Sequence, residues 1–85
     1  PKIGAMNFRT SIHSTKQQQL RAIFKSQREA LGLTQRQLAE QMGVIYSLIG
    51  KIETGDRRLD VCEFITYCQA LKLDPCQVIK LLDNS

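Results

Sequence analysis

The segment from Thr34 to Gly55 constrains the fold of this chain most strongly, because it specifies two short helices joined by a tight turn. Thr34 is a favourable N-cap, and Gln37 three residues later completes a capping box, so a helix should begin at Gln35. Gly43 can adopt the left-handed conformation that ends this helix within a single residue. A second set of apolar residues at helical spacing follows at once and ends at Gly55. Two helices with so short a link must cross steeply.

Capping residues and apolar periodicity predict three further helices and no strand. The first runs from about residue 16 to residue 31, with Gly32 as its stop signal. The fourth begins at Asp60 and runs to about residue 71, and the fifth begins at Asp74, with Pro75 in its first turn. The residues expected on the core sides of the first and fourth helices are Leu20, Ile23, Phe24, Leu31, Phe64, Tyr67, Cys68 and Leu71.

The sequence therefore predicts a compact, five-helix, all-α domain over residues 16–85. Residues 1–15 lack apolar periodicity, and we expect them to form a flexible N-terminal arm. Residues 1–5 could be left over from an expression vector, so they receive no functional role. No apolar run approaches the ~20 residues that cross a bilayer, and no secretory signal pattern is present. We accordingly expect a cytoplasmic protein without a membrane partner.

The chain offers little for catalysis or metal binding. Cys62, Cys68 and Cys76 include no Cys-x-x-Cys pair, and the single His13 lies far away in sequence, so no zinc site is expected. We interpret the cysteines as small, buried or half-buried residues, with redox sensing as the alternative. No glycine-rich phosphate loop or nucleophile–base set is present. The sequence thus predicts no enzyme, no cofactor and no small-molecule ligand.

The net charge of +4 is unevenly distributed along the chain. Residues 1–36 carry seven Lys or Arg and one acidic residue, whereas residues 37–85 carry five basic and seven acidic residues. Such a division suits a protein that turns one side towards a polyanion. Many small soluble domains have a similar charge, so this asymmetry alone does not decide the partner.

Two segments resemble a known family. Residues 28–44 (REALGLTQRQLAEQMGV) and residues 49–58 (IGKIETGDRR) closely resemble the phage-repressor/Cro type of helix-turn-helix domain, the XRE family. The resemblance extends over roughly residues 20–82, with several motifs in order at the right spacing. It implies a lambda-repressor-like fold that inserts its third helix, about residues 45–53, into the major groove of double-stranded DNA.

The resemblance also implies the roles of individual residues. Residues at the matching positions of the third helix would read bases, and these are Ile45, Tyr46, Ser47 and Lys51. Residues at the start of the second helix and in the loop after the third would contact phosphates, and these are Gln35, Arg36, Arg57 and Arg58. Arg28 and Glu53 occupy positions that form a partly buried ion pair in similar domains.

The third helix departs from the family pattern. Ile45 stands where the family usually has Ser or Thr, so it cannot cap the helix, and Tyr46 stands where glutamine is frequent. Gly50 further weakens so short a helix. Leu48 is expected on the side that faces water or DNA. These features suggest either readout of T-rich DNA through methyl groups or a surface that binds protein.

The sequence therefore predicts a sequence-specific transcriptional regulator, either a repressor or an autoregulator. A homodimer on an inverted repeat is expected, because one helix-turn-helix unit covers too few base pairs. Leu81 and Leu82 could pair two protomers or could pack on their own core. The alternative function is a protein-interaction module or antitoxin-like partner protein that uses an apolar face of Ile45, Tyr46 and Leu48.

Overall fold

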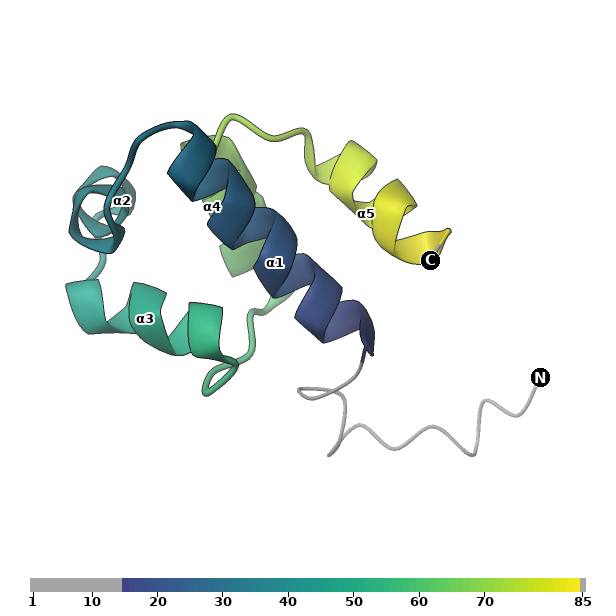
Figure 1. Cartoon of the computed structure of the whole chain (residues 1–85), viewed down its shortest axis with the longest axis horizontal. Helices are drawn as coiled ribbons and strands as arrows, with labels where there is room; N and C mark the ends of the chain where they lie inside the picture. The colour runs from purple at the N-terminus through teal and green to yellow at the C-terminus, as the bar shows by residue number, and fades with distance from the viewer. Residues whose placement is uncertain (1–14, 85) are drawn as a thin grey trace.

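The computed structural model describes residues 15–84, which form five α-helices and no strand (Figure 1). The helices are α1 (Thr15–Ala30), α2 (Gln35–Met42), α3 (Tyr46–Thr54), α4 (Val61–Ala70) and α5 (Pro75–Asp83). The predicted five-helix, all-α domain is therefore confirmed. The arm predicted over residues 1–15 falls almost wholly outside the described residues.

Local capping explains where α2 and α4 begin. The Thr34 side chain accepts a hydrogen bond from the Gln37 N–H, and the Gln37 side chain accepts one from the Thr34 N–H. Asp60 and Glu63 form the same reciprocal pair at α4. Each box satisfies two backbone donors that a helix start leaves without intrahelical partners. Both boxes are as the sequence predicts.

The turn between α2 and α3 depends on a left-handed glycine. Gly43 has φ of 72°, and its N–H donates to the Glu40 carbonyl, which ends α2 as predicted. Only residues 43–45 separate the two helices, so α2 and α3 cross closely and pack against each other (Figure 1). This geometry fixes the position of α3 relative to the rest of the domain.

The core lies between α1, α4 and the α2–α3 pair. Phe24 of α1 stacks on Tyr67 of α4, with ring centroids 4.4 Å apart. Leu38 of α2 and Ile49 of α3 are fully buried in the same cluster. Burial of apolar surface of this kind provides most of the driving force for folding. The helix α5 covers the opposite side of α1 and α4, and contributes Val78 to the core.

Several burial predictions were wrong. Leu31 lies beyond the last turn of α1 and is exposed. Cys62 and Cys76 are also exposed, because both lie in the first turn of a helix on its solvent side. Cys68 is buried as predicted, and burial raises the pKa of its thiol to about 11. No helix within residues 15–84 is long and apolar enough to cross a membrane.

Candidate nucleic-acid interface

The outward face of α3 carries three of the residues predicted to read bases. Tyr46, Ser47 and Lys51 are exposed, whereas Ile49 and Ile52 on the opposite side of the same helix are buried in the core. The two buried isoleucines fix the rotation of α3 about its axis. The polar groups of the three exposed residues are therefore turned away from the domain, where a ligand can approach them.

The start of α3 is unusual. Ile45 occupies the N-cap position and makes no side-chain capping hydrogen bond, as its aliphatic side chain requires. It is also 72% exposed, and the neighbouring Tyr46 is 45% exposed. The first turn of α3 thus offers outward-facing backbone N–H groups together with two apolar side chains. Thymine methyl groups and apolar protein side chains could both contact such a surface.

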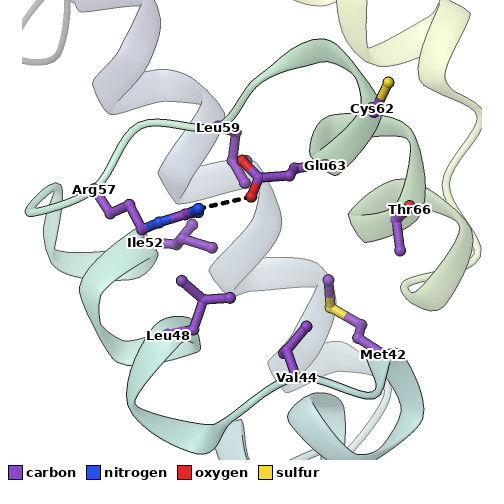
Figure 2. A pocket seen from close by; sticks show the side chains of 9 residues that line it. All are labelled: Met42, Val44, Leu48, Ile52, Arg57, Leu59, Cys62, Glu63 and Thr66. Atoms are coloured by element: carbon purple, nitrogen blue, oxygen red, sulfur yellow. Dashed lines mark hydrogen bonds and ion pairs between the residues drawn. The ribbon is translucent and has the colours of Figure 1, made fainter.

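Leu48 does not face outward, which corrects the expectation from the sequence. It is half-buried and packs against the buried core cluster, next to a hollow that Cys62 and Thr66 of α4 also line. The hollow is apolar and has a volume of about 230 Å³. Figure 2 shows Leu48 pointing into it together with Val44 and Met42. The expected continuous apolar face is therefore divided, with Leu48 turned away from Ile45 and Tyr46.

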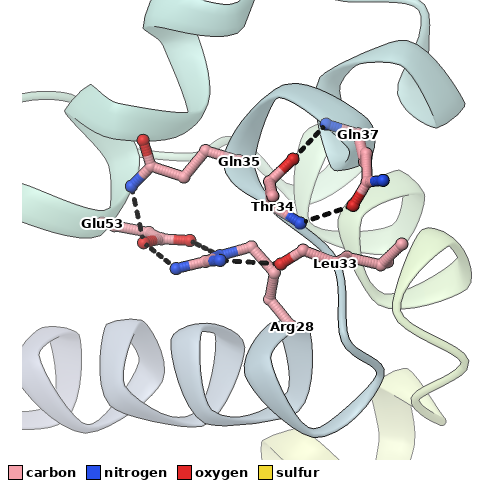
Figure 3. Close-up of polar contacts among 6 residues, drawn as sticks. All are labelled: Arg28, Leu33, Thr34, Gln35, Gln37 and Glu53. Carbon is pink, nitrogen blue, oxygen red and sulfur yellow. Dashed lines mark hydrogen bonds and ion pairs between the residues drawn. The ribbon is translucent and has the colours of Figure 1, made fainter.

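A polar cluster joins α1, α2 and α3 (Figure 3). Arg28 donates from Nε and Nη2 to the two carboxylate oxygens of Glu53, at 2.7 and 3.1 Å, and from Nη1 to the Leu33 carbonyl at 2.8 Å. The side chains of Arg28 and Glu53 are only 10% and 4% exposed. The hydrogen bond to Glu53 raises the pKa of Arg28 above its usual value, so the guanidinium stays charged. Bidentate pairing holds the end of α3 against α1.

Gln35 completes this cluster. Its Nε2 donates to Glu53 Oε1 at 2.9 Å, so one amide hydrogen is already used inside the protein (Figure 3). The resemblance had implied a phosphate contact for this side chain. The exposed backbone N–H groups at the start of α2 still favour an anion there. The cluster thus positions the beginning of α2 and the end of α3 relative to each other.

Arg57 and Arg58 lie in the loop after α3. Arg57 Nη2 donates to Glu63 Oε2 of α4 at 2.7 Å (Figure 2), and Arg58 is exposed beside it. This hydrogen bond is the main reason why the pKa of Glu63 is lowered and that of Arg57 is raised. Arg57 Nη1 is shielded from solvent and has no hydrogen-bond partner among residues 15–84. The ion pair fixes the loop against α4 and leaves this donor unused.

Arg36 makes a contact that the sequence did not indicate. Its guanidinium carbon lies 4.5 Å from the centroid of the Tyr46 ring, which brings the start of α2 to the start of α3. The two residues are ten positions apart on different helices, so no local spacing rule could have predicted the pair. The described residues contain no cluster of three side chains able to hold a metal ion.

Comparison with known proteins agrees with this geometry. A helix-turn-helix family model matches residues 24–78. The structure is similar to that of an XRE-family-like protein from Pseudomonas syringae pv. tomato, with 34% identity over 93% of this chain and 96% of that one, and a TM-score of 0.81. The chain belongs to the XRE family of helix-turn-helix proteins. Family membership indicates a DNA-binding regulator rather than an enzyme.

Two further solved structures share the fold at lower sequence identity. Two structures of the clp gene regulator ClgR from Corynebacterium glutamicum are 24% identical, each over 84% of this chain, with TM-scores of 0.71 and 0.72. This chain covers 92% of one of those structures and 76% of the other. At this identity the likeness extends to the fold alone. No curated protein shows significant sequence similarity to this XRE-family chain.

Proposed function

We propose that this protein is a sequence-specific transcriptional regulator that inserts α3 into the major groove of double-stranded DNA. The observation that carries the proposal is the exposed row of Tyr46, Ser47 and Lys51 on a helix whose other side is anchored in the core. In helix-turn-helix proteins the N-terminal residues of the recognition helix contact base edges. The Arg28–Glu53 pair holds that helix in a fixed orientation.

Within this proposal, the base contacts follow from side-chain chemistry. Lys51 can donate to guanine O6 and N7 or to a phosphate, and Ser47 can donate to or accept from a base edge. Ile45 and the ring of Tyr46 can pack on thymine methyl groups. The absence of an amide side chain at these positions removes the bidentate contact by which Asn and Gln recognise adenine.

Contacts to the DNA backbone would set position and affinity rather than sequence choice. The proposed phosphate contacts are the backbone N–H groups at the start of α2, at Gln35, and the two arginines in the loop after α3, Arg57 and Arg58. Arg57 Nη1 has no partner among residues 15–84 but is shielded from solvent, so the Arg57 side chain must turn outward before this donor can meet a phosphate. Arg58 is already exposed.

We further propose that the protein acts as a homodimer on an inverted repeat, as a repressor or an autoregulator. Two recognition helices double the number of base pairs that are read, with half-sites roughly 34 Å apart. A dimer seated on an operator would exclude other proteins from the same DNA. The alternative function is a protein-interaction module, and the exposure of Ile45 together with the apolar hollow beside Leu48 favours it.

Selection of bound sequences from a random duplex DNA pool, near physiological salt, tests the proposal. An enriched inverted repeat is the expected result. Binding to that repeat should weaken steeply as the salt concentration rises, because neutralised phosphates release counterions. If the folded protein enriches no sequence, the DNA proposal is wrong. Salt-insensitive binding to a protein partner would then support the alternative.

A further inference from the structure

The contact between Arg36 and Tyr46 places a cation at the N-terminal end of α3. In the proposed function, this end of the helix contacts the base edges. Arg36 is the second residue of α2, Tyr46 is the first residue of α3, and both side chains are exposed. Arg36 makes no hydrogen bond or ion pair to any of residues 15–84. Arg28 and Arg57, in contrast, are each paired with a glutamate. Within the described chain, the N–H donors of Arg36 thus remain available to a ligand.

Stacking prepares a guanidinium for recognition. An arginine that lies over an aromatic ring gains a cation–π attraction through its face, and its N–H donors continue to point outward along its edge. The ring also restricts the side chain, so less conformational freedom is lost when the donors bind. Tyr46 therefore holds Arg36 in a position from which a planar acceptor pair can be met edge-on.

We propose that Arg36 reads a guanine through O6 and N7, held in position by the ring of Tyr46. This inference rests on the proposed function and assigns a base contact where the sequence resemblance had implied a phosphate contact. The first turn of α3 carries Ile45, Tyr46 and Ser47, none of which has two parallel donors. Arg36 supplies the bidentate donor pair that this turn lacks, and guanine is the base whose major-groove edge offers two acceptors.

The same geometry predicts the identity of the neighbouring base pair. Arg36 lies over one side of the Tyr46 ring, and Tyr46 as a residue nevertheless remains 45% exposed. The exposed part of the ring can contact the methyl group of a thymine next to the guanine. The pair would accordingly select a guanine and an adjacent thymine together in each half-site.

The test compares sequence selection by the parent protein with selection by Arg36→Lys, Arg36→Ala, Tyr46→Leu and Tyr46→Phe. Arg36→Lys keeps the charge but loses the planar fork, and Tyr46→Phe keeps the ring. We expect Arg36→Ala and Tyr46→Leu to lose the preference for one guanine by about 5- to 100-fold, while other positions of the motif persist. Arg36→Lys, which keeps donors for O6 and N7 but not the planar fork, should weaken the preference less than Arg36→Ala does. Tyr46→Phe should retain that preference. Circular dichroism checks that each variant is folded.

Base analogues on the selected duplex provide an independent measurement with the unaltered protein. Replacing that guanine by 7-deazaguanine removes the N7 acceptor, and it should weaken binding of the parent protein but not of Arg36→Ala. Replacing the adjacent thymine by uracil removes the methyl group. This change should weaken DNA binding by the parent protein more than DNA binding by Tyr46→Leu.

Two results would overturn the inference, and they differ from each other. If the parent protein enriches a motif and the Arg36 variants enrich the same one, with uniformly weaker binding and a salt slope smaller by about one, Arg36 contacts a phosphate. In that case the proposed function stands and only the guanine contact is wrong. If the parent protein enriches no sequence at all, both the proposed function and the guanine contact are wrong.

Discussion

Single residues in this domain join distant parts of the chain, and the Arg28–Glu53 ion pair is the strongest example. Removing one partner leaves a charge with little access to water, which typically costs about 3–5 kcal/mol. We predict that Arg28→Ala lowers the free energy of unfolding by an amount in that range, as measured by urea denaturation. DNA affinity should fall with it, because α3 loses its anchor to α1.

The matched control for this variant is Lys25→Ala, an exposed basic residue on the same helix, which should change stability very little. If Arg28→Ala and Lys25→Ala have the same denaturation midpoint, the ion pair contributes nothing to stability and the account of how α3 is anchored is wrong.

The three cysteines differ in chemistry because they differ in burial. Thiolates are the reactive form, and Cys68 is buried with a pKa raised to about 11, so its thiol stays protonated at pH 8. Cys62 and Cys76 are exposed. We predict that iodoacetamide rapidly modifies two cysteines of the native protein, and all three in denaturant, as counted by mass spectrometry. Rapid modification of Cys68 in the native protein would contradict its burial.

At the scale of the helical elements, α3 contains two unfavourable features that the rest of the domain must offset, its uncapped start and an internal glycine. A Cβ at Gly50 would lie 3.5 Å from Gln35 Oε1, which is an ordinary van der Waals contact. We predict that Gly50→Ala raises the free energy of unfolding by up to about 1 kcal/mol, because alanine loses less backbone freedom in a helix. Thermal denaturation monitored by circular dichroism measures this change.

Gly55 provides the contrasting variant at the other end of α3. It has φ of 89°, and a Cβ there would come within 2.9 Å of the Arg21 guanidinium carbon. Gly55→Ala should therefore destabilise the domain by about 1–2 kcal/mol or more. Both variants add one methyl group. If they change the free energy of unfolding in opposite directions, the cause is the local surroundings of each glycine and not the added methyl group itself. Equal shifts would refute this explanation.

The elements also show which parts of the structure the sequence could predict. Helix boundaries were predicted well, because Thr34, Gly43 and Asp60 act on the adjacent turn and need no distant partner. The direction of the Leu48 side chain was not predicted, because it depends on the position of α4, which lines the same hollow through Cys62 and Thr66. The hydrogen bond from the Gln35 amide to Glu53 could not be predicted either. The two residues are eighteen positions apart, and the same amide could have bound a phosphate instead.

At the scale of the whole molecule, the arrangement of the helices separates two kinds of surface. The helices α2 and α3 lie on one side of α1 and α5 lies on the other, so the readout residues are remote from the C-terminal helix (Figure 1). Besides Ile45 and Tyr46 near the start of α3 and Leu31 after α1, the exposed large apolar side chains lie on α4 and α5. These are Val61, Ile65, Ile79 and Leu81. Leu82, in contrast, packs against the core. Of the two leucines considered for dimer contacts, only Leu81 is substantially exposed, at 60%.

A dimer formed through this side would leave both copies of α3 open to DNA. We predict that Leu81→Glu makes the protein monomeric in sedimentation equilibrium, because a desolvated charge opposes an apolar interface. Its affinity for the selected inverted repeat should fall by about tenfold or more, since each half-site is then bound separately. Affinity for an isolated half-site should not change.

The control for this variant is Ser26→Glu, which adds the same charge at an exposed position of α1, away from the apolar side chains of α4 and α5, and should leave both association and binding unaltered. If Leu81→Glu still dimerises and binds the inverted repeat as tightly as the parent protein, the interface does not include Leu81. The two protomers would then have to meet through another surface, or only on the DNA, where the adjacent half-sites bring them together.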